Sequence, residues 1–277
     1  MSRFFFGLLL ILCINKAEAA PLTRSRWLMG TLLEATVDRP QDAPALESAF
    51  AEVDRLEALL STYRPASEVS RLNAAAGSPA RPVSEDLWLL LAASSRAWAA
   101  SGGLFDPTYS SLPLARGFGR LTLAAGIRSV ALPPGGHLDF GGIGKGYALD
   151  AAAAALRARG VRRALLNFGG QVYALGRWDV RTPGGAVVLE DASAATSGDS
   201  ERPGHIVDPA TGASRRGPAT ATVLLPSATE ADAWSKPLYL GGVAALPHPF
   251  SGCALFVPSE GARPERFGND CNRSAFR

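Results

Sequence analysis

The stretch Leu138-Asp139-Phe140-Gly141-Gly142-Ile143-Gly144-Lys145-Gly146-Tyr147-Ala148-Leu149-Asp150 places four glycines within six positions, directly before a predicted helix. Glycines let the backbone approach a ligand closely, and N–H groups at a helix start favour anions such as phosphate. The stretch departs from the Walker A loop because Lys145 is followed by Gly146 rather than Ser or Thr, and its G-x-G-x-G spacing differs from the dinucleotide-binding fingerprint. On glycine content alone, a tight strand–helix turn is favoured over a phosphate site.

Helical periodicity is clearest before this stretch. Asp42 and Pro44 offer an N-cap and a first-turn residue, and the apolar residues that follow recur at three- and four-residue spacing, which predicts one buried stripe. The stripe comprises Leu46, Phe50, Val53, Leu56 and Leu60. A second helix is expected over Ser84–Ala100, with Gly102-Gly103 ending it.

Two further helices are expected after the glycine-rich stretch. One follows Gly146 and runs through an alanine-rich segment to Gly160. The other covers Thr229–Tyr239, and Pro237 should kink or end it near Lys236, since proline lacks the backbone N–H that a helix interior needs.

Short β-branched and apolar runs, mostly bounded by Gly or Pro, predict the strands. They are Leu32–Val37, Ala164–Phe168, Gln171–Ala174, Trp178–Arg181, Ala186–Leu189, Thr220–Leu225 and Ala254–Val257. Helices lead and strands follow, which favours an α+β fold over a doubly wound parallel sheet, with one crossover through the alanine-rich helix. No linker, charge block or repeat divides the chain, so we expect residues 20–277 to form a single domain with mixed or antiparallel sheets and packed helices.

Composition excludes several classes of protein. The 277 residues are 47% hydrophobic, which suffices for a substantial core and argues against disorder. The 28 cationic side chains are 25 arginines and three lysines against 25 acidic residues, and no cluster of five or more occurs. This distribution argues against a polybasic nucleic-acid-binding protein.

The first 19 residues are typical of a secretory signal peptide. Arg3 precedes an apolar run from Phe4 to Ile14, and a small-x-small pattern ends at Ala19. The run is too short to span a bilayer, which takes about 20 residues. We therefore expect export to the periplasm. Lipid anchoring at Cys13 is disfavoured because the residue that would precede the cleavage site is not small.

Three features, a cysteine pair and two single side chains, have two interpretations each. Cys253 and Cys271 can form a disulfide in an exported chain or remain unpaired. His205, next to the turn-forming Asp208-Pro209, is either an active-site group or a satisfied turn residue. Asp232 either complements a helix N-terminus or binds a hard cation such as magnesium.

The order of these segments and the residues within them resemble those of the ApbE family, the FAD:protein FMN transferases. The matching blocks span nearly the whole chain after the signal segment, and it is their collinearity that is specific. They are Met29–Thr31, Ser61–Arg64, Ser67–Asn73, Gly103–Thr108, Asp139–Asp150, Asn167–Gly170, Thr196–Gly198, His205–Gly212 and Ala231–Ala233.

The resemblance implies an exported protein that binds FAD and, with magnesium, moves the FMN half onto a Ser or Thr hydroxyl of an acceptor, releasing AMP. It also implies that the acceptor is a membrane-associated redox subunit. The residues implied to contact FAD are Met29, Tyr63, Leu104, Phe105, Asp106, Gly141, Lys145 and Ile206. The Gly144 carbonyl and Asp232 would hold the metal, and His205 would accept the hydroxyl proton.

One departure concerns the implied metal site. The family usually has Thr four residues after the metal-binding Asp, where this chain has Lys236. Its ammonium can partly replace the metal ion, or it can point to solvent beside Pro237. The chain is also shorter than the family pattern between Arg120 and His137 and between Arg181 and Ala194. A FAD pyrophosphatase giving FMN and AMP, and a non-catalytic periplasmic flavin-binding protein, are therefore alternatives to the transferase.

Overall fold

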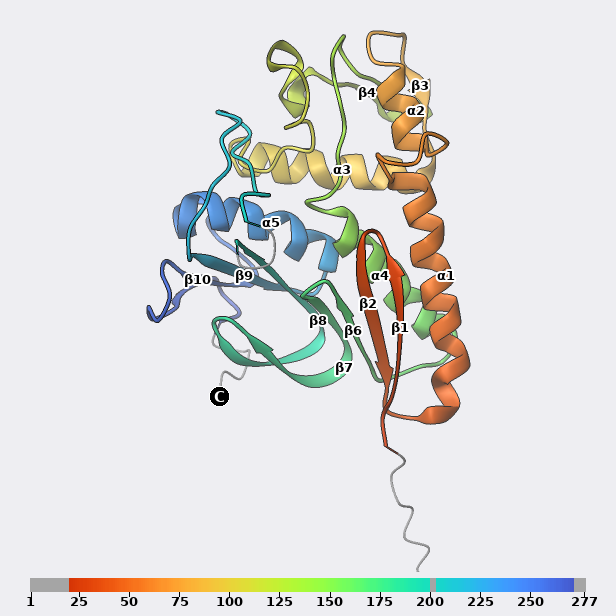
Figure 1. The fold of residues 1–277 in the computed structure, drawn as a ribbon, viewed down its shortest axis with the longest axis vertical. Helices are drawn as coiled ribbons and strands as arrows, with labels where there is room; N and C mark the ends of the chain where they lie inside the picture. Colours follow the sequence, from red (N-terminus) through yellow and green to blue (C-terminus); the bar gives the residue numbers. More distant parts are fainter. Residues whose placement is uncertain (1–19, 200–202, 272–277) are drawn as a thin grey trace, which may run out of the picture.

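The computed structural model describes residues 20–199 and 203–271, so the expected signal peptide lies outside the described residues. Figure 1 shows a large sheet with α4 and α5 on one of its faces, α1 alongside, and a second group of elements around α2 and α3. The helices are α1 (Ala43–Leu60), α2 (Glu68–Ala74), α3 (Glu85–Ala100), α4 (Gly144–Ala158) and α5 (Ala228–Gly241). Short 3-10 turns occupy Pro40–Asp42, Pro113–Ala115, Phe118–Arg120, Ala125–Ile127 and Gly242–Ala245.

Eight strands form the large sheet in the order β1-β2-β6-β7-β8-β9-β10-β11, and β3, β5 and β4 form a small one. Their bounds are β1 Leu22–Leu28, β2 Thr31–Val37, β3 Arg81–Pro82, β4 Thr122–Ala124, β5 Ser129–Ala131, β6 Ala164–Phe168, β7 Gln171–Thr182, β8 Gly185–Gly198, β9 Thr220–Leu225, β10 Cys253–Val257 and β11 Glu265–Phe267. All pairs of these strands are antiparallel. The α+β prediction is confirmed, whereas the crossover through the alanine-rich helix is wrong, because β6 after α4 pairs antiparallel with β2.

The two strands expected at Gln171–Ala174 and Trp178–Arg181 are one strand, β7. Its pairing with β8 shifts register between Ala174 and Arg177, and Gly176 there has φ 68°. A glycine with positive φ permits a bulge that bends a strand without ending it. The strand boundary expected at this glycine is therefore wrong.

Helix α5 also differs from its prediction. It continues past Pro237 to Gly241, and the N–H of Gly242 bonds to the carbonyl of Leu238. Leu238 and Tyr239 are completely buried in the core beneath β9 and β10. Burial of these two side chains outweighs the hydrogen bond that the proline cannot make.

The remaining helix predictions hold except at one cap and at the start of α4, which begins at Gly144 rather than after Gly146. All five residues of the predicted stripe are buried on α1, and Ser84 caps α3 by accepting the Leu87 N–H at 3.3 Å. Asp42 makes no side-chain cap hydrogen bond. Its carboxylate instead accepts bonds of 2.9 and 3.0 Å from the guanidinium of Arg39.

Cys253 and Cys271 are joined by a disulfide, which resolves the two interpretations of this pair. The bond ties the first residue of β10 to the segment after β11. Within residues 20–199 and 203–271, no helix is long and apolar enough to cross a membrane.

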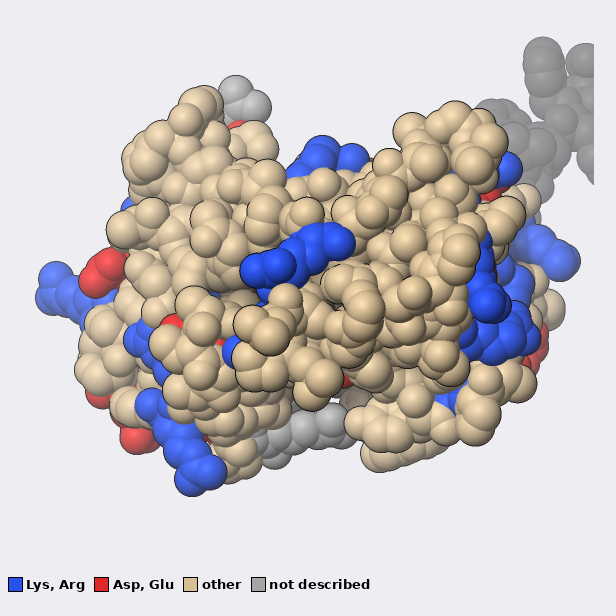
Figure 2. Space-filling model, turned by 90° about the horizontal axis from the view of Figure 1, so that it is seen from above, with Lys and Arg blue, Asp and Glu red and all other residues tan. Residues whose placement is uncertain are grey.

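The end of the molecule that carries β3 and β4 is largely uncharged. Figure 2 looks onto this end and shows scattered Lys and Arg among uncharged residues, with little Asp or Glu. Leu112, Leu114 and Ile127, from the segment before and after β4, are 65%, 88% and 71% exposed.

Candidate functional site

The turn between β1 and β2 holds Met29. Met29 and Gly30 both have positive φ, 47° and 73°, as the two-residue turn of a tight hairpin requires. The N–H of Met29 donates to Glu57 on α1 at 2.9 Å, and Arg64 donates to the same carboxylate at 3.1 Å. Tyr63, next to Arg64, is 94% exposed. The structure thus brings the expected FAD contacts Met29 and Tyr63 to the same end of α1.

The beginning of the glycine-rich stretch is fixed by two neighbours. Asn73 on α2 makes a pair of hydrogen bonds with the backbone of Leu138, at 2.9 and 2.8 Å. The carboxylate of Asp139 accepts the Tyr109 hydroxyl at 3.1 Å and the N–H of Gly141 at 2.7 Å. Burial raises the pKa of Tyr109, and the Asp139 charge adds to this shift. Gly141 is therefore held in a turn that the side chain of Asp139, two residues earlier, closes by its hydrogen bond.

Leu104 and Phe105 lie between the glycine-rich stretch and α5. Phe105 is 4% exposed, and a Cβ added to Gly142 would lie 3.4 Å from its ring. A Cβ added to Gly241, at the end of α5, would lie 3.2 Å from Leu104. Both residues are therefore packed against parts of the chain, which positions the loop after α3.

Asp106 organises the loop that follows. Its Oδ1 accepts the N–H and the hydroxyl of Thr108, at 2.8 and 2.6 Å, and Thr108 in turn accepts the N–H of Gly117 at 2.8 Å. Burial raises the pKa of Asp106, although the bonds from Thr108 oppose this shift. The described hydrogen-bond partners of Asp106 thus belong to its own loop. Holding a turn together in this way is the commonest role of an aspartate at such a position.

Helices α4 and α5 cross at Gly146. A Cβ at this position would lie 2.2 Å from the carbonyl oxygen of Ala228 and 2.8 Å from the Cβ of Asp232. The N–H of Gly146 donates to Oδ2 of Asp232 at 3.0 Å. The glycine therefore permits a close approach of two helices, whereas a Cβ at Gly144 would meet only ordinary contacts, the nearest at 3.7 Å.

Asp232 and Lys236 form a buried pair one turn apart on α5. Asp232 is 2% exposed and the Lys236 side chain 19%. The Lys236 ammonium donates to Oδ1 of Asp232, and to the Asp232 carbonyl at 3.0 Å. From the sequence, Lys236 could lie either in place of the metal or directed to solvent. In the structure, the Lys236 ammonium lies against the Asp232 carboxylate.

Lys145 at the start of α4 lies close enough for its charge to act on both members of the pair. Burial alone would raise the pKa of Asp232, but the charges of the two lysines hold that pKa below its usual range. Burial lowers the pKa of Lys236, and Lys145 adds to this shift, although the Asp232 charge opposes it. The cluster of Lys145, Asp232 and Lys236 therefore places two cationic side chains and one carboxylate at the N-terminal end of α4.

These residues do not fit the expected magnesium site. Both oxygens of Asp232 already have partners, Gly146 and Lys236. Gly144 is the first residue of α4, where a regular helix uses the carbonyl to accept an N–H four residues later. Across residues 20–199 and 203–271, no group of three or more His, Cys, Asp or Glu could hold a metal ion. A divalent cation would have to displace Lys236 from the carboxylate.

The N-terminus of α5 depends on Asp150, a residue to which the sequence assigned no role. From α4, its carboxylate accepts the N–H groups of Ala228 and Thr229 at 2.8 and 2.9 Å and the hydroxyls of Ser227 and Thr229 at 2.9 and 2.6 Å. A carboxylate at a helix N-terminus also complements the helix dipole. Asp150 thereby fixes the helix that carries Asp232 and Lys236.

Replacing Asp150 by asparagine is expected to lower the free energy of unfolding by about 2 to 3 kcal/mol, because bonds to a charged acceptor are lost and an amide NH₂ faces donors. Urea unfolding followed by circular dichroism measures this effect. The control is Asp54→Asn on the exposed face of α1, which should change stability by less than about 0.5 kcal/mol. Equal effects of the two substitutions would show that the cap contributes nothing specific.

His205 and Ile206 lie on the segment between β8 and β9. His205 is exposed, whereas Ile206 is 6% exposed and belongs to the core that includes Tyr239. The carboxylate of Asp208 accepts the N–H of Ala210 at 2.8 Å, which is the turn chemistry expected from the sequence. The buried isoleucine thus anchors the segment on the end of α5.

Arg116 connects this segment to the loop organised by Asp106. Its guanidinium donates to the carbonyl of Pro209 at 3.3 Å and would meet a Cβ at Gly212 at 3.2 Å. The sequence shows no sign of this contact, because the partners are about ninety positions apart.

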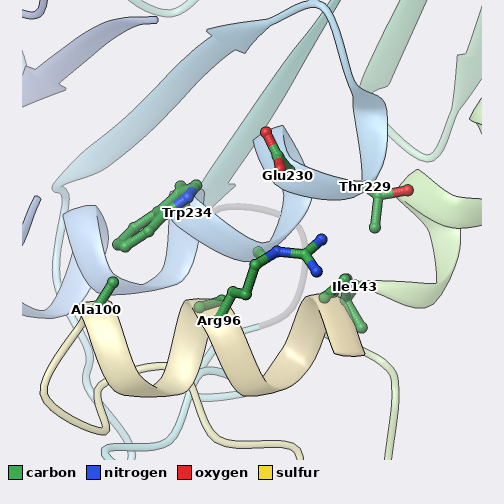
Figure 3. A pocket seen from close by; sticks show the side chains of 9 residues that line it. Arg96, Ala100, Ile143, Thr229, Glu230 and Trp234 are labelled. Atoms are coloured by element: carbon green, nitrogen blue, oxygen red, sulfur yellow. The ribbon is translucent and has the colours of Figure 1, made fainter. Parts of the chain in front are cut away.

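A cavity of about 180 Å³ lies between α3 and α5. Figure 3 shows Arg96 extending from α3 beneath α5 toward Thr229 and Ile143, with Trp234 on the other side. The lining residues are Ala93, Arg96, Ala97, Ala100, Ile143, Thr229, Glu230, Ala233 and Trp234. None of these is an expected FAD contact, and the volume is below the range of about 300 to 1,000 Å³ typical of ligand pockets.

A sequence model of the ApbE family matches residues 29–248. The chain is 29% identical to a FAD:protein FMN transferase of Treponema pallidum, over 88% of this chain and 86% of the relative. It is 31% identical to one of Rhodobacter capsulatus, over 82% of this chain and 52% of the relative. Solved structures with the same fold include flavin transferase ApbE from Vibrio cholerae, with a TM-score of 0.80 and 21% identity, covering 92% of this chain and 99% of that one.

Proposed function

The chain belongs to the ApbE family, and on that premise we propose that it transfers the FMN half of FAD to a protein hydroxyl, releasing AMP. The observation that carries the proposal is the cluster of Lys145, Asp232 and Lys236 at the start of α4, inside the region matched by the family. Two ammonium groups and the N-terminal end of a helix favour a phosphate-bearing ligand at this place.

In the proposed reaction, the hydroxyl oxygen of an acceptor Ser or Thr attacks the phosphorus on the FMN side of the FAD diphosphate. The bond from this phosphorus to the bridging oxygen breaks, and AMP leaves with that oxygen. The hydroxyl proton passes to His205, and the positive groups of the cluster offset the charge on the phosphate oxygens. Phosphoryl transfer depends mostly on such positioning and electrostatics.

The resemblance to the ApbE family implies a magnesium ion bound by the Gly144 carbonyl and the Asp232 carboxylate. Lys236 and Gly146 occupy both oxygens of the Asp232 carboxylate, so the proposed reaction uses no metal ion. If magnesium bound in this chain, it would neutralise charge on the phosphate oxygens after displacing Lys236.

We further propose that the chain acts in the periplasm after removal of residues 1–19, on a membrane-associated redox subunit carrying a Ser/Thr flavinylation motif. The disulfide Cys253–Cys271 supports export, since such bonds persist in oxidising compartments. The relatives are FAD:protein FMN transferases, a name that includes FAD and a protein acceptor, and this supports the kind of partner.

The experiment mixes the chain from residue 20 with FAD and a candidate acceptor, with and without magnesium, and analyses the products by mass and in-gel fluorescence. We expect FMN covalently attached to the acceptor, together with AMP. Free FMN and AMP in the presence of a competent acceptor would instead identify a FAD pyrophosphatase. Intact bound FAD would identify a flavin-binding protein, and either result would overturn the transferase proposal.

A further inference from the structure

The ammonium of Lys236 sits on the carboxylate that the family resemblance assigns to a metal ion. We propose that Lys236 takes the place of this divalent cation, so that its ammonium binds the FAD diphosphate and the chain needs no metal for this step. The inference rests on the proposed function, because it concerns how the same site binds FAD.

The geometry that holds the ammonium is built into α5. Lys236 lies four residues after Asp232 on the same face of the helix, and it donates to both the carboxylate and the carbonyl of that residue. The Gly146 N–H occupies the other carboxylate oxygen at 3.0 Å. Asp232 therefore positions a cation that is already part of the chain.

The position of the lysine stem places the ammonium beside the glycine-rich stretch. A Cβ at Gly142 would lie 3.6 Å from Cε of Lys236 and 3.4 Å from the ring of Phe105. These are ordinary van der Waals distances, so the lysine stem packs next to Gly142. The ammonium is thus adjacent to the loop that is expected to face the diphosphate.

The charge around the ammonium favours an anion over a second cation. Lys145 acts on the pair from α4, so that two ammonium groups and one carboxylate carry a net charge of about +1. The first-turn N–H groups of α4 add partial positive charge. A divalent cation placed here would be repelled, whereas a diphosphate would be attracted.

A simpler role for Lys236 is to neutralise a buried carboxylate and nothing more. In that case its removal would change the stability of the fold and leave the affinity for FAD unaltered once the protein is folded. The proposal requires the opposite pattern, a loss of FAD affinity in protein that is still folded. Affinity and stability therefore have to be measured on the same samples.

The test measures FAD affinity of the chain from residue 20 by flavin fluorescence, in EDTA and in millimolar magnesium. The unaltered protein is expected to bind FAD with the same affinity in both, within about threefold. Lys236→Met keeps the apolar stem and removes the charge, and should weaken binding by about 10- to 100-fold in EDTA. The control Arg159→Met removes one exposed positive charge from the end of α4 and should have no effect.

Lys236→Thr frees one oxygen of Asp232 and supplies a hydroxyl. It should lose FAD affinity in EDTA as Lys236→Met does, and should regain it with magnesium. Electron paramagnetic resonance of Mn²⁺ without FAD provides a second readout. The Thr variant should bind micromolar Mn²⁺, whereas the unaltered protein should not.

Two outcomes would overturn the inference. One is a loss of FAD affinity in EDTA that magnesium restores in the unaltered protein. The other is normal FAD affinity of folded Lys236→Met. Thermal unfolding of each variant verifies that it is folded. Failure to modify any acceptor would count against the proposed function only, because FAD and Mn²⁺ binding are judged without transfer.

Discussion

Replacing Gly146 by alanine is expected to destabilise the protein by about 3 kcal/mol or more. The added Cβ would lie 2.2 Å from the carbonyl oxygen of Ala228 and 2.7 Å from its carbon, both backbone atoms that cannot move away alone. Overpacking of this kind costs about 1 to 3 kcal/mol, and more where backbone must shift. Separating α4 from α5 would also weaken the bond from Gly146 to Asp232. Urea unfolding gives the free energy directly.

The matched control is Gly144→Ala, two positions earlier in the same helix. Its Cβ would meet Phe140 at 3.7 Å and Leu60 at 4.0 Å, which are ordinary contacts. Because alanine favours a helix over glycine by about 1 kcal/mol, this variant should be as stable as the unaltered protein or more so. If both variants unfolded at the same urea concentration, the close helix crossing would be refuted.

Gly146 also shows where sequence reasoning reached its limit. Four glycines before a helix suggested backbone close to a phosphate, yet the atom that requires this glycine is a carbonyl about 80 residues later. Local spacing carries no information about such a partner. The same holds for Asp150, whose four hydrogen-bond donors lie at the N-terminus of α5.

Periodicity predicted the elements that bury one face. Helix α1 and strands β6 and β9 have the bounds or the buried faces that their apolar spacing indicates. Strand β1 was missed because five consecutive residues, Thr23 to Trp27, are exposed at the edge of the sheet and leave no apolar alternation. The end of α5 was misplaced because burial of Leu238 and Tyr239, a tertiary effect, overrides the local preference of Pro237.

The lysines were the most informative signal for the site. In a chain with 25 arginines, the two lysines of the described region, Lys145 on α4 and Lys236 on α5, both act on Asp232. Because lysine is rare in this chain, the two lysines could be distinguished from the other cationic side chains by composition alone. What the sequence could not supply was the position of the Lys236 ammonium, because replacement of the metal ion and exposure to solvent were both compatible with a helix that kinks or ends at Pro237.

Replacing His205 by alanine is expected to lower the single-turnover rate of FMN transfer by about 10²- to 10⁴-fold, the usual contribution of a general base. The affinity for FAD should change by less than about threefold, because the backbone of the segment is held independently of the imidazole. Ile206 is buried, and its carbonyl accepts the N–H of Arg215 at 2.9 Å. Rapid-quench sampling, followed by quantification of the FMN-labelled acceptor that has formed, measures the rate.

The control for this prediction is His248→Ala, another exposed histidine, whose ring lies 4.6 Å from that of Phe267. It should transfer FMN at the unaltered rate. Without a base, the reaction depends on the small fraction of acceptor hydroxyl that is ionised, and this fraction grows with pH, so the deficit of His205→Ala should shrink as pH rises. A deficit that stayed constant with pH, or a rate equal to that of the control, would refute the assignment of His205 as the base.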